Sequence, residues 1–77
     1  MSYNDKIKII LNKLSNIEEI KLEDCDIYQE YSVVVLYKGN DSDIIICDNS
    51  YDAKILFGYL TERLEEFQAQ NENSTQI

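Results

Sequence analysis

The sequence of 77 residues contains no histidine, no proline and no tryptophan, and only two glycines and two cysteines. Without histidine, the chain lacks the side chain that titrates nearest to neutral pH and most often serves enzymes as a general base. It also lacks the usual companion of cysteine in zinc sites. No glycine-rich phosphate loop or nucleophile elbow is present. We therefore expect no enzymatic activity, no metal site and no cofactor.

The two cysteines, Cys25 and Cys47, are far apart and do not have a metal-binding spacing. Cys47 ends an apolar run, where a thiol behaves as a small hydrophobic side chain. A reducing compartment also disfavours a disulfide. We expect Cys47 to be a buried free thiol and not the partner of Cys25.

Long hydrophobic runs are also missing. No apolar stretch approaches the roughly 18 residues that a membrane-spanning helix requires. The first ten residues, MSYNDKIKII, place charges inside their only apolar patch, which is not the pattern of a signal peptide. We expect a cytoplasmic protein that does not bind membranes, located in the host bacterial cytoplasm if a phage encodes it.

Basic residues are few. The chain has 15 acidic and 7 basic residues, which gives a net charge of −8. Nucleic acids and anionic membrane surfaces repel such a chain. The charge therefore argues against direct nucleic-acid binding and favours a basic protein partner.

Two segments have the composition of β-strands. Residues 31–38 (YSVVVLYK) and 43–47 (DIIIC) are rich in β-branched and aromatic side chains. Because side chains alternate between the faces of a strand, Val33, Val35 and Tyr37 share one face, and Val34 and Leu36 share the other. By the same rule, Ile44 and Ile46 lie opposite Ile45 and Cys47. Both strands are thus apolar on both faces, which predicts a buried sheet or a second face covered by a partner. The intervening GNDS predicts an antiparallel hairpin with a turn of about four residues.

Helices are expected on both sides of this hairpin. Residues 2–14 carry apolar side chains at helical spacing, namely Ile7, Ile10, Leu11 and Leu14. After the second strand, Asn49 or Ser50 can cap a helix that has Asp52 in its first turn. One stripe of this helix contains Ala53, Leu56, Phe57, Leu60, Leu64 and Phe67.

The stretch 17–30 is less regular. Ile20 and Leu22 alternate with charged residues as in an edge strand, whereas the following EDCDIYQE predicts a loop or bulge. We therefore predict an α+β fold with a three-stranded antiparallel sheet, an N-terminal helix and a C-terminal helix (α-β-β-β-α), both helices on one face. Residues 1–67 form the single domain, and residues 68–77 form a flexible polar tail.

Acidic residues concentrate in two places. The first is the hairpin turn with its flanks, which contains Asn40, Asp41, Ser42 and Asp43. The second lies within the irregular stretch and contains Glu23, Asp24, Asp26 and Glu30. Carboxylates two positions apart on a strand are separated by about 6.6 Å, comparable to twice the rise of about 3.4 Å between phosphates of one DNA strand. Such clusters can imitate a nucleic-acid backbone, or they can simply solvate the surface and protect a sheet edge.

The order of elements resembles that of small anti-CRISPR inhibitors that block the type II RNA-guided nuclease. The resemblance covers residues 3 to 64 and rests on Asn4-Asp5, the strand YSVVVLYK, the turn GNDSD, the strand IIICD and the helix opening NSYDAKILFGYL. It implies that acidic side chains occupy the arginine-lined groove in which the nuclease reads DNA beside its target. By position, Asn40, Asp41, Ser42 and Asp43 would enter this groove, with their side chains pointing outward. The chain differs from that family in lacking an acidic third helix.

Three hypotheses for function follow. The first is a non-enzymatic inhibitor that mimics DNA charge and blocks a basic nucleic-acid-binding protein, most specifically a type II CRISPR nuclease. The second is a small interaction or dimerisation module with a regulatory or structural role, in which the doubly apolar hairpin dimerises. The protein is expected to be a monomer or a homodimer. The third is an immunity protein for a basic toxin. Binding by charge mimicry weakens steeply with salt, whereas a hydrophobic contact does not.

Overall fold

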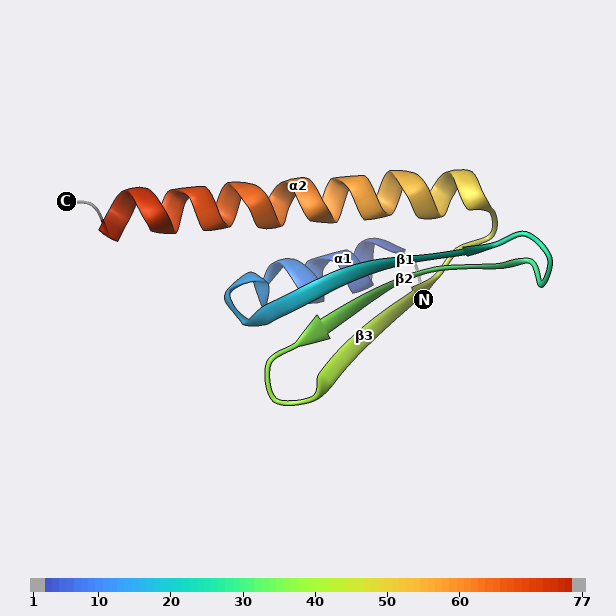
Figure 1. Cartoon of the computed structure of the whole chain (residues 1–77), viewed down its shortest axis with the longest axis horizontal. Helices are drawn as coiled ribbons and strands as arrows, with labels where there is room; N and C mark the ends of the chain where they lie inside the picture. The colour runs from blue at the N-terminus through green and yellow to red at the C-terminus, as the bar shows by residue number, and fades with distance from the viewer. Residues whose placement is uncertain (1–2, 76–77) are drawn as a thin grey trace.

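The computed structural model describes the backbone of residues 3–75 and the side chains of residues 3–70. Its elements are α1 (Tyr3–Leu11), the short 3-10 helix η1 (Leu14–Asn16), β1 (Ile17–Cys25), β2 (Glu30–Tyr37), β3 (Asp41–Ile46) and α2 (Ser50–Thr75). The three strands form one antiparallel sheet in the order β1-β2-β3 (Figure 1). The predicted α-β-β-β-α fold is confirmed.

Helix α1 is shorter than the sequence predicted. It ends at Leu11. The chain then forms a tighter turn, in which the Lys13 amide donates a hydrogen bond to the Ile10 carbonyl three residues back. Such tight turns are frequent at helix ends. Ile10 is fully buried, and Ile7 and Leu14 pack against the core with it, so the predicted apolar face is confirmed. The predicted first residue, Ser2, lies outside the described residues.

Strand β1 is longer than predicted. Residues 23–25, assigned to a loop or bulge from the sequence, continue the pairing with β2 as far as Cys25 opposite Glu30. Only residues 26–29 form the turn, where Gln29 adopts a φ of 52°. The register irregularity lies at the other end of β1, between Ile17 and Glu19. The pairing overrides local sequence here, because backbone hydrogen bonds to β2 are available to any residue type.

The β2–β3 connection is tighter than the four residues predicted. Tyr37 pairs directly with Asp41, so only residues 38–40 link the strands. Gly39 and Asn40 have φ values of 85° and 66°. These left-handed conformations suit glycine and asparagine, which explains both residue types at this position. Asp41, Ser42 and Asp43 therefore belong to β3 and not to the turn.

Helix α2 begins as predicted and extends further. Asn49 is the cap: its Oδ1 accepts the Asp52 amide at 2.8 Å, and its amide group donates to the Asp52 carboxylate at 3.3 Å. The segment predicted to be a flexible tail is helical through Thr75, while residues 76–77 lie outside the described residues. The sequence beyond Phe67 contains no glycine or proline, and each added residue of an existing helix gains one hydrogen bond without a new nucleus.

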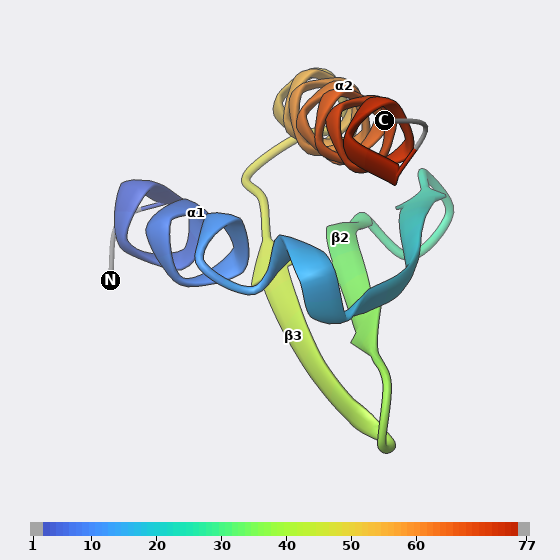
Figure 2. The ribbon, with the colours of Figure 1, turned by 90° about the vertical axis from the view of Figure 1, so that its left-hand side faces the viewer.

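Both helices contribute to one core on one face of the sheet (Figure 2). The buried residues of the strands after β1 all project toward this side, namely Val33, Val35, Tyr37, Ile45 and the adjoining Cys47. From the helices, Ile10, Ala53, Leu56 and Leu60 complete the core. The predicted division of side chains between the two faces of the hairpin is therefore confirmed, and the helices leave the opposite face of the sheet open.

Candidate functional site

The face of the sheet turned away from the helices, here called the outer face, is defined by the strand register. Lys21 pairs with Val34, which in turn pairs with Ile44, so these three side chains project on the same side. The alternation of each strand adds the remaining members, Glu19, Glu23, Cys25, Glu30, Ser32, Leu36, Ser42 and Ile46. The sheet is flanked by helices on its other face, so the strands hold the outer face on a rigid support.

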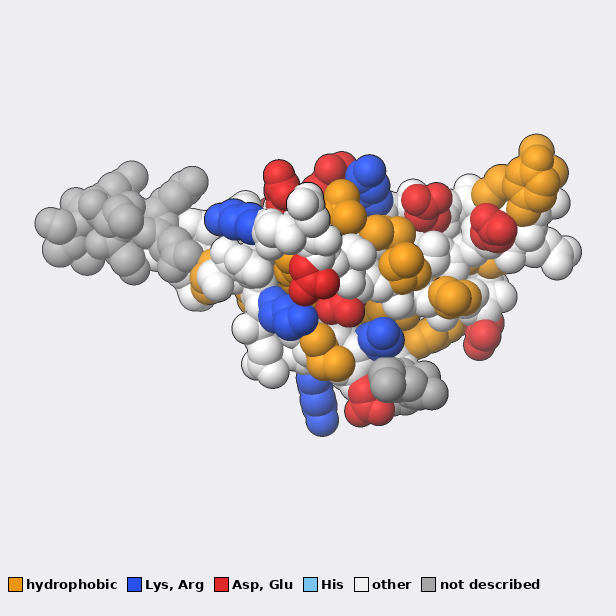
Figure 3. Space-filling view, turned by 90° about the horizontal axis from the view of Figure 1, so that it is seen from below, with side chains coloured by type: hydrophobic (Ala, Val, Ile, Leu, Met, Phe, Trp, Pro, Cys, Tyr) orange, Lys and Arg blue, Asp and Glu red, His pale blue; other side chains and the backbone are white. Residues whose placement is uncertain are grey.

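The middle of the outer face is apolar and accessible. Ile46 is 77% exposed and Ile44 is 50% exposed, while Val34 and Leu36 are half-buried. Hydrophobic side chains are visible among charged ones when the molecule is viewed from below (Figure 3). An antiparallel sheet with one solvated face normally carries polar residues there. Contiguous exposed apolar side chains instead mark contact surfaces.

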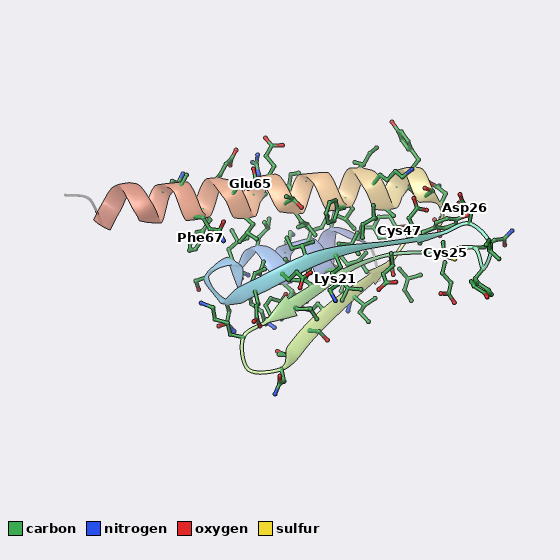
Figure 4. All side chains as sticks on the ribbon, viewed as in Figure 1. Lys21, Cys25, Asp26, Cys47, Glu65 and Phe67 are labelled. Atoms are coloured by element: carbon green, nitrogen blue, oxygen red, sulfur yellow. The ribbon has the colours of Figure 1, made fainter. Side chains whose placement is uncertain are left out.

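Charge is distributed unevenly around this apolar centre. Strand β1 contributes Glu19, Lys21 and Glu23, and Glu30 lies at the start of β2. Lys21 lies on the side of β1 away from α2 (Figure 4). Strand β3 contributes only Ser42 and the two isoleucines to the outer face. The border of the outer face around its apolar centre, here called the rim, is therefore acidic along β1 and uncharged along β3.

The two acidic clusters predicted from the sequence lie at opposite ends of the sheet. Glu23, Asp24, Asp26 and Glu30 surround the β1–β2 turn, whereas Asn40, Asp41, Ser42 and Asp43 surround the β2–β3 connection (Figure 1). The strand between them has eight residues, which span about 26 Å. The structure therefore does not combine the clusters into one site.

Asp43 has a structural contact that the sequence did not predict. The Tyr37 hydroxyl donates a hydrogen bond to the Asp43 Oδ2 at 2.8 Å. Burial, and then this hydrogen bond to a carboxylate, raise the pKa of Tyr37 well above its ordinary value of 10.0. Lys13 lies over the ring of the same tyrosine, with its Nζ 5.0 Å from the centroid. The prediction that Asp43 points freely outward is wrong, because its carboxylate turns back to the buried tyrosine.

Asp41 and Asp24 are also engaged locally. The Asp41 Oδ1 accepts the backbone amide of Ser42 at 2.9 Å. Asp24 faces α2, where its Oδ2 accepts the Ser50 hydroxyl at 2.9 Å and lies 3.3 Å from the Lys54 Nζ. Asp24 thus joins the start of α2 to β1, while Glu23 beside it projects to the outer face.

Both cysteines are free thiols. Cys47 is buried on the helix-covered side, as predicted, whereas Cys25 projects to the outer side of β1 (Figure 4). Their positions on opposite faces explain why no disulfide forms.

Within the described part of the chain, no group of three or more histidine, cysteine or acidic side chains could hold a metal ion. No helix in residues 3–75 is long and apolar enough to cross a membrane.

A concave surface, which sequence analysis missed, lies between α1 and α2. It has a volume of about 560 Å³ and is lined by Tyr3, Asn4, Ile7, Asp52, Ile55, Leu56 and Tyr59. The Tyr3 hydroxyl is already engaged, since it accepts the Asp48 amide at 3.0 Å. Among the described residues, the sequence signal for this groove is the pair Ile55 and Tyr59, which are exposed and lie outside the predicted stripe of α2.

Comparison with known proteins gives one result. The family model described as "Longin: Regulated-SNARE-like domain" matches residues 1–77. Comparison with curated proteins and with solved structures gives no match. The matched family model covers the whole of the given sequence. The chain therefore belongs to the Longin, regulated-SNARE-like domain family, whose domains are small protein-interaction modules.

Proposed function

We propose that this protein is a non-enzymatic interaction module that holds a partner protein on the outer face of its sheet. The exposure of Ile44 and Ile46 at the centre of that face is the observation that supports this function most strongly. Family membership supports the general role, since the domain is a protein-interaction module. The acidic rim along β1 favours a partner whose contacting surface is apolar at its centre and basic at its edge.

The two isoleucines can supply a measurable part of the binding energy. Fully burying such a side chain contributes about 1.5–3 kcal/mol. Scaled by their exposed fractions of 77% and 50%, Ile46 and Ile44 together offer about 2–4 kcal/mol. Because about 1.4 kcal/mol corresponds to a tenfold change in Kd, losing both contacts should weaken binding at least tenfold.

The test compares two isoleucines that are similarly exposed in different places. Ile46 (77% exposed) lies on the outer face, and Ile27 (87% exposed) lies in the β1–β2 turn. Parental protein, Ile46→Ser and Ile27→Ser are each used as bait in lysate of the producing cells. We expect proteins retained by the parent to be lost with Ile46→Ser and kept with Ile27→Ser. If both variants retain the same proteins as the parent, or if the parent retains none, the outer face is not the docking surface.

The inhibitor predicted from the sequence gives a different result in this assay. Binding that depends on charge mimicry, whether to a type II CRISPR nuclease or to a basic toxin, should fall steeply with salt and with Asp41→Asn, and should tolerate Ile46→Ser. Asp41 is the suitable position because it is exposed, whereas Asp43 bonds Tyr37. Competition by short duplex DNA would further support the inhibitor.

A further inference from the structure

We infer that the occupant of the outer face is a basic amphipathic α-helix of the partner protein, an inference that rests on the proposed function. Three features restrict the kind of segment that can occupy the face: its apolar centre, its width and the one-sided charge of its rim. A helix with an apolar stripe and a flank of lysine or arginine side chains satisfies all three.

The dimensions of the outer face fit a single helix. Three strands spaced about 4.8 Å apart present a surface about 10 Å wide between the outer strands. An α-helix with its side chains is about 10–12 Å in diameter. The eight residues of β2 span about 26 Å, the length of about 17 helical residues at 1.5 Å each. A helix lying along β2 would therefore cover Val34, Leu36, Ile44 and Ile46 together.

The rim specifies the charge of this helix. Glu19, Glu23 and Glu30 outnumber Lys21 on the outer face, and all three glutamates are exposed. No ion pair joins any of the three to another described residue. Because the β3 side carries no charge on this face, the helix needs basic residues on only one flank.

A second copy of this chain fits the face less well. Each copy carries a net charge of −8, and two stacked outer faces bring two sets of the same glutamates to one interface. Desolvated like charges oppose such an assembly. A basic helix instead places opposite charges along the rim, which makes a different protein the better partner than a second copy.

The experiment uses the full chain and two synthetic helical peptides of 18 residues with the same leucine stripe. One peptide carries lysine at all its polar positions, and the other carries glutamate. Binding is measured by fluorescence anisotropy, and the contact is mapped by methyl NMR of isoleucine, leucine and valine. We expect the lysine peptide to bind at least tenfold more tightly than the glutamate peptide and to shift the methyl signals of Val34, Leu36, Ile44 and Ile46.

Charge variants separate a specific rim from general attraction to an acidic protein. Removing two rim charges with Glu19→Gln and Glu23→Gln should weaken binding of the lysine peptide several-fold and reduce its salt dependence. The control removes the same charge from α2 with Glu62→Gln and Glu65→Gln. Both residues are exposed, and Glu65 lies on the side of α2 away from the sheet (Figure 4). The control pair should leave the affinity within about twofold of the parental value.

The outcomes distinguish this inference from the proposed function. The outer face docks proteins but does not select a basic helix if the two peptides bind there equally tightly. The same conclusion follows if the rim variant and the α2 control variant change the affinity for the lysine peptide equally. If light scattering shows that the protein alone is a dimer and that Ile46→Ser makes it a monomer, the occupant is a second copy and the inference is wrong. If the lysine peptide shifts only the methyl signals of residues that line the groove between α1 and α2, both the inference and the proposed docking surface are wrong.

Discussion

Replacing Tyr37 with phenylalanine should destabilise the protein although the ring remains in the core. Tyr37 is only 2% exposed, and its hydroxyl donates to the Asp43 carboxylate at 2.8 Å. Phenylalanine keeps the packing, and Lys13 can still lie over the ring, so the change removes little beyond the hydrogen bond. The half-buried Asp43 then loses its donor.

The magnitude follows from the type of hydrogen bond. A bond to a charged group contributes about 1.5–3 kcal/mol. Water can reach the half-buried Asp43 and replace part of this interaction, so we expect a loss at or below the lower end of this range, about 1–2 kcal/mol. In a domain of this size, whose total stability is on the order of 5 kcal/mol, urea unfolding would detect such a change readily.

The pH dependence gives a second readout of the same contact. The pKa of Tyr37 is raised in the folded protein, chiefly by burial and then by its bond to Asp43, whereas the unfolded value is near 10.0. The folded state therefore holds the phenolic proton more tightly, and this contribution is complete below about pH 10 and lost as the pH rises toward the folded pKa. The parental protein should lose more stability above pH 10 than Tyr37→Phe does.

A double-mutant cycle with Asp43→Asn completes the test. If the two side chains act as a pair, the two substitutions together should cost clearly less than the sum of the single effects. Additive effects, or a Tyr37→Phe variant as stable as the parent at neutral pH, would show that the hydrogen bond does not stabilise the fold.

Three further predictions concern the core, the helix cap and the thiols. Leu60→Ala removes a fully buried side chain and should cost about 2–5 kcal/mol in urea unfolding; an unchanged midpoint would contradict its place in the core. Asn49→Ala removes the cap of α2 and should cost about 0.5–2 kcal/mol, whereas Asn49→Asp should retain most of the stability. A reducing agent should leave the melting temperature unchanged because Cys25 and Cys47 are free thiols, and a large drop would indicate a disulfide.

The sequence predicted local structure well where one periodicity dominates. Period-two alternation placed Val33 and Val35 on one face of β2, and both are fully buried. The same alternation showed that the hairpin is apolar on both faces, but it could not show which face the helices would cover. That choice depends on contacts between α1, α2 and the sheet, which are distant in the sequence.

The candidate site was predicted less completely, because its determinants are long-range. Asp43 was assigned to a turn from its residue type, whereas pairing with Val35 places it in β3 within reach of the Tyr37 hydroxyl. Asp24 was grouped with its acidic neighbours, although Lys54 and Ser50 of α2 engage it. Both assignments used charge and local composition, which do not encode contacts across strands and helices.

The most direct measurement of the central claim is hydrogen–deuterium exchange of this protein with and without the partner retained by the parental bait. A partner on the outer face should protect β2 and β3, including the backbone amides of Ile44 and Ile46, and leave the α1–α2 groove around Ile55 unchanged. Protection confined to that groove, or to the turn at Asn40 and Asp41, would contradict docking on the outer face of the sheet.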